Sequence, residues 1–135
     1  MIRVSLSTME CGSCRHPEAM TMRGAPWGIV RFPSIVGVMR HPSEGVILFD
    51  TGYDRAFLEA TRPMPERLYR ITTPVDLSDG ESAVERLEAL GIAAGDVRHV
   101  VLSHFHGDHV SDVRQFDERV TSPDRREGAF GRDLR

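Results

Sequence analysis

The chain has 135 residues, of which 40% are hydrophobic and 27% are charged, as in an ordinary globular domain or part of one. Its net charge of −3 and its scattered arginines argue against nucleic acid or an anionic membrane as the main partner. No run approaches the roughly 18 apolar residues of a membrane span, and the N-terminus lacks a signal-peptide pattern, so we expect a cytoplasmic protein.

Strands are expected in the first part of the chain. Residues 2–9 alternate apolar and polar side chains, which predicts a half-buried outer strand of a sheet. Residues 10–33 are rich in glycine and proline and predict a loop, in which Trp27 either contacts substrate or, as is commoner for a lone aromatic, fills the edge of the core. Residues 34–40 and 46–49 are apolar runs joined by turn formers, and they predict a β-hairpin.

Two cysteines in the predicted loop form a lone C-x-x-C at Cys11 and Cys14, followed by His16. The pair could be half of a zinc site or a redox pair. However, a structural zinc site takes four ligands and a thioredoxin-like motif opens a helix. Two reduced thiols without a metal are therefore favoured, because a cytosolic pair is normally kept reduced.

Helices are expected before the next strand. Residues 54–60 predict a short helix, and prolines punctuate an irregular segment that runs to residue 77. Ser78 and Glu81 match a capping box for a second helix that stops at Gly91. Its apolar face would be made by Ala83, Val84, Leu87 and Leu90. Residues 97–103 are dense in Val and Leu, as in a central buried strand, and His99 within them is expected to be a packed or edge histidine.

Three histidines and an aspartate fall within six residues directly after that strand. In an extended chain His104 and His106 point to the same side and can converge on one ion. Gly107 lets the backbone turn, which can bring Asp108 and His109 to a neighbouring ion. This donor set suits a borderline divalent ion such as Zn²⁺. The alternative, a histidine-rich loop without metal, leaves several imidazoles that each need hydrogen-bond partners.

The motif H-x-H-x-D-H at His104, His106, Asp108 and His109 resembles the signature of the metallo-β-lactamase-fold metallo-hydrolases. The run from Ile47 to Gly52 and the segment 15–18 are similar to a bacterial subgroup that includes lactonase-like enzymes. The likeness covers residues 1–116. It implies an α/β or α+β fold, a four-layer αβ/βα sandwich of two similar halves, of which this chain supplies the N-terminal half.

The resemblance also implies a site. His104 and His106 would hold one ion of a dinuclear zinc centre, and Asp108 and His109 the other, with iron or manganese as alternatives. Asp108 would in addition be catalytic, by orienting a hydroxide that attacks a lactone, ester, thioester or amide carbonyl, with lactones favoured. Asp50 lies close to the metals in the family, where it would orient a ligand by a hydrogen bond. Its alternative role is an Asx-turn within its own loop.

The family completes both metal sites with ligands from the second half, but no histidine follows His109 here. We therefore expect a truncated or frameshifted product, a fragment, or a half that dimerises. An uncovered sheet face would drive self-association. The residues expected on that face are Val36, Val38, Val46, Leu48, Val100 and Leu102. A helix is expected after His109 through Phe116, and residues 117–135 are polar and predict a disordered or frameshifted tail.

Two rival functions come from other classes. The same motif serves mononuclear iron enzymes that oxidise persulfides, in which His104 and His106 would bind iron. The second rival is a non-enzymatic remnant that binds metal weakly. The favoured prediction is a metal-dependent hydrolase with a small-molecule substrate.

Overall fold

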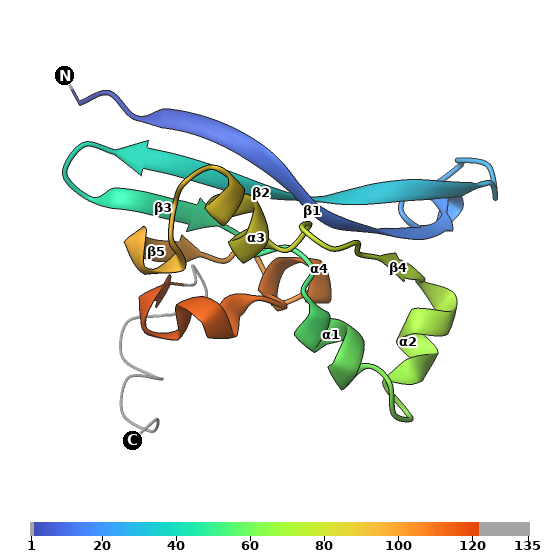
Figure 1. Cartoon of the computed structure of the whole chain (residues 1–135). Coiled ribbons are helices and arrows are strands. Elements are labelled where there is room, and N and C mark those ends of the chain that lie inside the picture. Colours follow the sequence, from blue (N-terminus) through green and yellow to red (C-terminus); the bar gives the residue numbers. More distant parts are fainter. Residues whose placement is uncertain (1, 122–135) are drawn as a thin grey trace, which may run out of the picture.

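The computed structural model describes residues 2–121, and the statements below concern these residues. They form one mixed sheet of six strands in the order β4-β1-β2-β3-β5-β6 (Figure 1). A long hairpin lies along the top of the view, and the helices lie below it. None of the helices within this range has the length and apolar character needed to cross a bilayer.

The hairpin consists of β1 (Ser5–Pro17) and β2 (Ile29–His41), which pair antiparallel along most of their length. The prediction of a loop over residues 10–33 was therefore wrong at both ends, because β1 continues to Pro17 and β2 already begins at Ile29. The reason is a register shift between Glu10 and Ser13, where Gly12 has a φ of 75° and interrupts the alternation expected of a strand. The connection retains only a short turn of 3-10 helix, η1 (Glu18–Met20), and flanking turns. Trp27 there is 76% exposed, so it does not fill the core edge.

The rest of the sheet follows the expected order more closely. The predicted hairpin of β2 with β3 (Gly45–Phe49) is confirmed. β5 (Val97–Val101) runs parallel to β3, and β6 (Val120–Thr121) runs parallel to β5. The edge strand β4 (Val75–Asp76) pairs with only two residues of β1. His99 on β5 is exposed and lies 4.0 Å from Glu44, away from the metal motif.

The helices are short. α1 (Arg55–Ala60) was expected, and Asp54 caps its first turn by accepting a hydrogen bond from the Ala56 amide at 3.2 Å. α2 (Arg67–Thr72) lies in the segment expected to be irregular, because the prolines before it hid the helical pattern. Two further elements are η2 (Ala94–Asp96) and α4 (Gly107–Val110).

The helix α3 (Ala83–Ala89) begins four residues later than the predicted capping box. Ser82 is its N-cap and forms the reciprocal pair of hydrogen bonds with Glu85. The predicted pair makes two hydrogen bonds in the preceding turn, from the Ser78 amide to the Glu81 carboxylate and from the Glu81 amide to the Ser78 carbonyl. Leu90 is 55% exposed and does not belong to the buried face.

The core lies between one sheet face and these helices. Val36, Val38, Leu48, Val100 and Leu102, which were expected to be uncovered, are at most 2% exposed. Leu87 of α3 and Phe116 of η3 (Val113–Arg119) belong to the same cluster. The expectation of an open face made by these residues was therefore wrong. The opposite face carries the exposed apolar side chains of Leu6, Ile35 and Phe49.

The tail expected over residues 117–135 is only partly covered by the described residues. Residues 117–119 complete η3, and residues 120–121 form β6. The prediction of a disordered or frameshifted tail otherwise falls on residues 122–135, which lie outside the described residues.

Candidate metal centre

The candidate site forms where two parallel strands end. β3 is followed by Asp50, and β5 is followed by residues 103–109, which we call the metal loop. Because β3 and β5 are parallel neighbours, their carboxyl ends meet at the same sheet edge, where α/β proteins commonly place their ligands. The Asp50 amide extends this pairing by donating to the Val101 carbonyl at 2.8 Å.

Asp50 is only 3% exposed and has a φ of 64°, a left-handed conformation that Asp tolerates better than most residues. Its Oδ1 accepts a hydrogen bond from the Ser103 amide at 2.7 Å. Its Oδ2 accepts one from the Ser103 hydroxyl at 2.8 Å and lies 2.7 Å from Nδ1 of His109. Both carboxylate oxygens thus bind the metal loop, and the ring of His109 is held in one orientation.

The four expected donors lie in two close pairs. Nε2 of His104 is 2.9 Å from Nδ1 of His106. Nε2 of His109 is 3.0 Å from a carboxylate oxygen of Asp108. The rings of His104 and His109 are adjacent, with 4.0 Å between their centroids. The structure therefore brings His104 close to His106, and Asp108 close to His109.

These pairs fit a metal ion on two grounds. With metal-to-nitrogen bonds of about 2.0–2.1 Å, donors this close would subtend an angle of roughly 90° at one ion. The Nδ1–H of His109 donates to Asp50, which leaves the Nε2 lone pair for a metal, as in the carboxylate–histidine arrangement common behind zinc. Within residues 2–121 no three His, Cys, Asp or Glu side chains already surround one point. Each ion would thus take two ligands from these residues.

Backbone contacts fix the metal loop against the sheet. The amide and the hydroxyl of Thr51 both donate to the His109 carbonyl at 2.9 Å. The Ser34 hydroxyl of β2 donates to the Asp108 carbonyl at 2.7 Å. Hydrogen bonds from Ser34 and Thr51 therefore hold the end of the metal loop that carries Asp108 and His109.

Gly107 serves a purpose that the sequence did not indicate. It has no positive φ, so its role is not the unusual turn that was expected. A Cβ atom there would lie 2.4 Å from the ring of Phe57, so only glycine gives this ring room. Phe57 also packs on Tyr53 and, edge-on, on Tyr69, with centroids 5.2 and 5.9 Å away. No local pattern could have revealed a contact between residues fifty positions apart.

Cys11 and Cys14 are both unpaired and buried within β1, not in a loop. Burial raises the pKa of the Cys11 thiol to about 12, which disfavours the thiolate that binds metals and attacks disulfides. His16 stacks on Phe32 with 4.1 Å between ring centroids. The segment therefore does not form a second metal site among the described residues.

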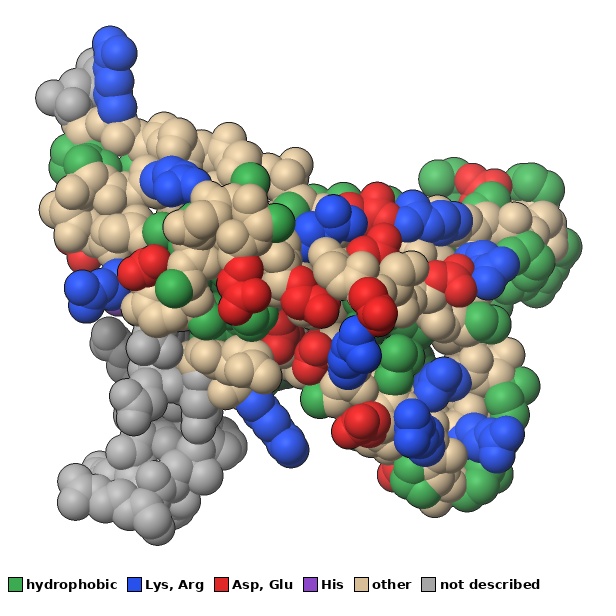
Figure 2. All heavy atoms as spheres, viewed as in Figure 1, with side chains coloured by type: hydrophobic (Ala, Val, Ile, Leu, Met, Phe, Trp, Pro, Cys, Tyr) green, Lys and Arg blue, Asp and Glu red, His purple; other side chains and the backbone are tan. Residues whose placement is uncertain are grey.

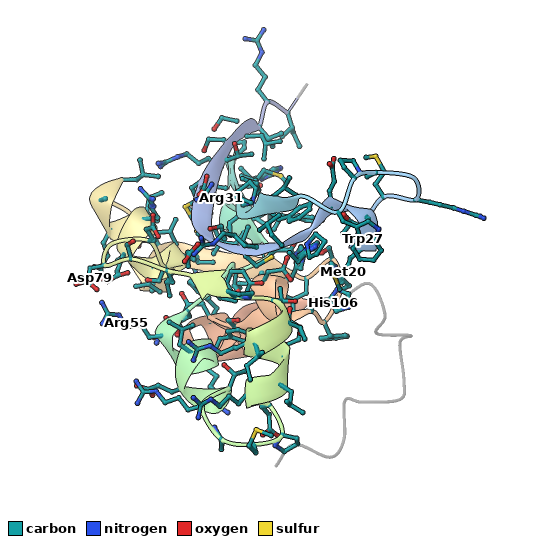
Figure 3. All side chains as sticks on the ribbon, turned by 90° about the vertical axis from the view of Figure 1, so that its right-hand side faces the viewer. Met20, Trp27, Arg31, Arg55, Asp79 and His106 are labelled. Atoms are coloured by element: carbon teal, nitrogen blue, oxygen red, sulfur yellow. The ribbon has the colours of Figure 1, made fainter. Side chains whose placement is uncertain are left out.

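Trp27 and the metal loop face one side of the molecule. Figure 3 shows Trp27 and Met20, from the β1–β2 connection, on the same side as His106. Met20 is 59% exposed, so two large apolar side chains are available on that side.

The fold is that of a mixed α/β protein with four candidate metal donors at one sheet edge, and comparison with known proteins identifies its family. The model of the metallo-beta-lactamase superfamily matches residues 30–131, and the chain belongs to this superfamily. The expected family and fold class are thereby confirmed.

A probable metallo-hydrolase of Mycobacterium bovis is 32% identical over 95 residues, which are 68% of this chain and 30% of the relative. The Mycobacterium tuberculosis counterpart matches equally well. The chain thus spans less than a third of the length of these curated relatives.

Two solved structures show the same fold. An N-acyl homoserine lactone hydrolase, with N-hexanoyl-L-homoserine at its catalytic metal centre, has a TM-score of 0.70 and 19% identity, over 86% of this chain and 46% of its own. A dizinc quorum-quenching lactonase has a TM-score of 0.53 and 17% identity, over 82% and 36% of the two chains.

Proposed function

We propose that this chain carries the first metal-binding motif of a dinuclear metal-dependent hydrolase. The observation that carries the proposal is the pairing of four donors at one sheet edge, with Asp50 behind His109. Two pairs of donors can serve two ions, and the dizinc lactonase among the structural neighbours supports two ions over the single iron of a persulfide dioxygenase. The family and the metallo-hydrolase relatives support the same reaction class.

In this proposal His104 and His106 hold the first ion, and Asp108 and His109 hold the second. We expect zinc at both positions, with iron or manganese as alternatives. The ions would act as Lewis acids on the substrate carbonyl and on water.

The chain's own residues would position the reacting groups. Asp50 keeps the proton of His109 on Nδ1 and so keeps Nε2 available as a ligand. Asp108 would also accept a hydrogen bond from the attacking water and orient it toward the carbonyl, which is its catalytic role. The Ser103 hydroxyl, 2.9 Å from Nδ1 of His104, would fix that ring in the same way.

We propose a small-molecule substrate with a lactone, ester, thioester or amide bond, and favour a lactone. The lactonase neighbours support this choice, although at their identities they share only the fold with this chain. Trp27 and Met20 would contact the apolar part of the substrate. The cytoplasm remains the expected location.

The test uses a full-length relative with the same six-residue motif, because this chain spans only part of its relatives. Replacement of the residues equivalent to His106 or Asp108 by alanine should lower kcat by orders of magnitude and change KM less, since both act on the reacting groups. The control replaces the residue equivalent to the exposed His99 and should leave kcat unchanged. Near-normal turnover in both motif variants would overturn the proposal.

A further inference from the structure

A cavity of about 530 Å³ opens between the end of α1, α2 and β4. All of its lining comes from residues 61–75, so it contains none of the metal donors. Figure 2 shows arginine side chains gathered at the lower right, over the region of α1 and α2. The lining side chains used below are Arg62, Arg67, Arg70, Ile71, Pro74 and Val75.

Within residues 2–121, the three arginines of this cavity have no acidic partner. The arginine ion pairs among the described residues are made by Arg15, Arg31, Arg55 and Arg86. Arg70 uses one nitrogen, Nη1, to donate to the Leu58 carbonyl at 2.9 Å, which leaves its other N–H groups for a ligand. Three unneutralised guanidinium groups at one cavity are unexpected in a chain whose net charge is −3.

Close positive charges repel one another, and a bound anion removes this cost. The guanidinium fork matches the oxygens of phosphate and carboxylate groups, and three forks favour a ligand with more than one negative charge. Ile71, Pro74 and Val75 provide an apolar wall beside these charges. An apolar wall with a few convergent polar groups is the usual composition of a small-molecule site.

We propose that this cavity binds a phosphorylated small molecule, with the phosphate on Arg62, Arg67 and Arg70 and the organic part against Ile71 and Val75. Because the cavity uses no metal donor, its occupancy does not depend on the hydrolase function proposed above.

The probe is pyrophosphate, titrated calorimetrically into the metal-free chain at about 0.15 M salt, where weak surface attraction is screened. We expect saturable binding of one pyrophosphate per chain. Arg62→Gln and Arg67→Gln should each weaken it about tenfold or more, as expected for loss of a charge-assisted hydrogen bond. Both side chains are exposed and outside the core, and circular dichroism checks that the variants stay folded.

Arg40→Gln is the matched control, because Arg40 is an exposed arginine on β2 outside the cavity. It should leave pyrophosphate binding unchanged. A parallel titration with citrate separates phosphate from carboxylate recognition and should show weaker binding. The proposal is overturned if pyrophosphate does not saturate, if Arg40→Gln weakens binding as much as the cavity variants do, or if citrate binds as tightly.

Discussion

The Nδ1 atom of His109 lies 2.7 Å from a carboxylate oxygen of Asp50, 59 positions earlier in the chain. The contact exists because β3 and β5 are parallel neighbours that end at the same edge. Asp50 is also bound twice by Ser103, so the carboxylate that orients the histidine is itself held in place.

Asp50→Asn should weaken zinc binding by about 10–100-fold, because the amide accepts a weaker hydrogen bond from the imidazole than the carboxylate does. Asn tolerates the left-handed backbone, so the change acts on charge and not on the fold. Competition with a chromophoric chelator measures the affinity. Asp79→Asn, at an exposed carboxylate, is the control, and an equal loss in both variants would speak against the role of Asp50.

Gly107→Ala should destabilise the chain by about 1–3 kcal/mol, because the new methyl group would overlap the Phe57 ring. Phe57→Val in the same chain should recover part of this loss by making room. The free energies of unfolding of the two single variants and the double variant give the coupling between the positions. Strictly additive effects would show that the ring does not limit the space at Gly107.

The buried carboxyl group of Asp112 should make the free energy of unfolding depend on pH. Burial raises the pKa of this carboxyl from its ordinary value of 3.8 to about 7, and nearby Asp54 adds to the effect. The folded state therefore holds the proton of Asp112 more tightly than the unfolded state does. This difference adds to the free energy of unfolding in full below about pH 4, and the contribution is lost as the pH rises from about 4 to 7.

Asp112→Asn should remove this part of the pH dependence, which amounts to at most about 4 kcal/mol. The comparison is between denaturant unfolding of both proteins at pH 5 and pH 8, since the two proteins differ at no other residue. The amide can keep the hydrogen bond from the Val84 amide, which is 3.4 Å long here. If the two proteins lose the same stability over this range, Asp112 ionises freely in the fold.

Self-association remains a prediction, now assigned to the second sheet face, which carries Leu6, Ile35 and Phe49. At roughly 25 cal/mol per Å², burial of a few hundred Å² of apolar surface would favour association by several kcal/mol. Ile35→Thr should therefore lower the association constant in sedimentation equilibrium while preserving strand propensity. The control is Leu90→Gln, at an exposed position on the other side of the sheet, which should leave the association constant unchanged. A monodisperse monomer of the unaltered chain would exclude association.

The sequence predicted those elements whose structure depends on neighbouring residues in the chain. The β2–β3 hairpin, α1 and the strand before the metal motif carry their own periodicity and turn residues. The full length of β1 and β2 was missed because Gly12 lies in a bulge and Pro33 opposes Ser13 at the register shift. These residues interrupt the strand pattern without ending the strand.

The site shows the same division. The four candidate donors lie within six residues and are predicted by the motif alone, but the room that Gly107 gives Phe57 depends on how α1 packs. The covered sheet face was misjudged for a related reason. Which face α3 and Phe116 cover depends on tertiary packing, and alternation within a strand does not identify it.

The central claim is that His104 with His106, and Asp108 with His109, provide two ligands for each of two ions. Metal content measured by mass spectrometry after zinc loading and dialysis tests it most directly. Because catalytic zinc commonly takes three protein ligands, we predict that this chain retains fewer than two ions and holds them loosely. His106→Ala and Asp108→Ala should each lower the zinc content further, and His99→Ala should not. Two tightly retained ions per chain, or a zinc content unchanged in both motif variants, would contradict the account.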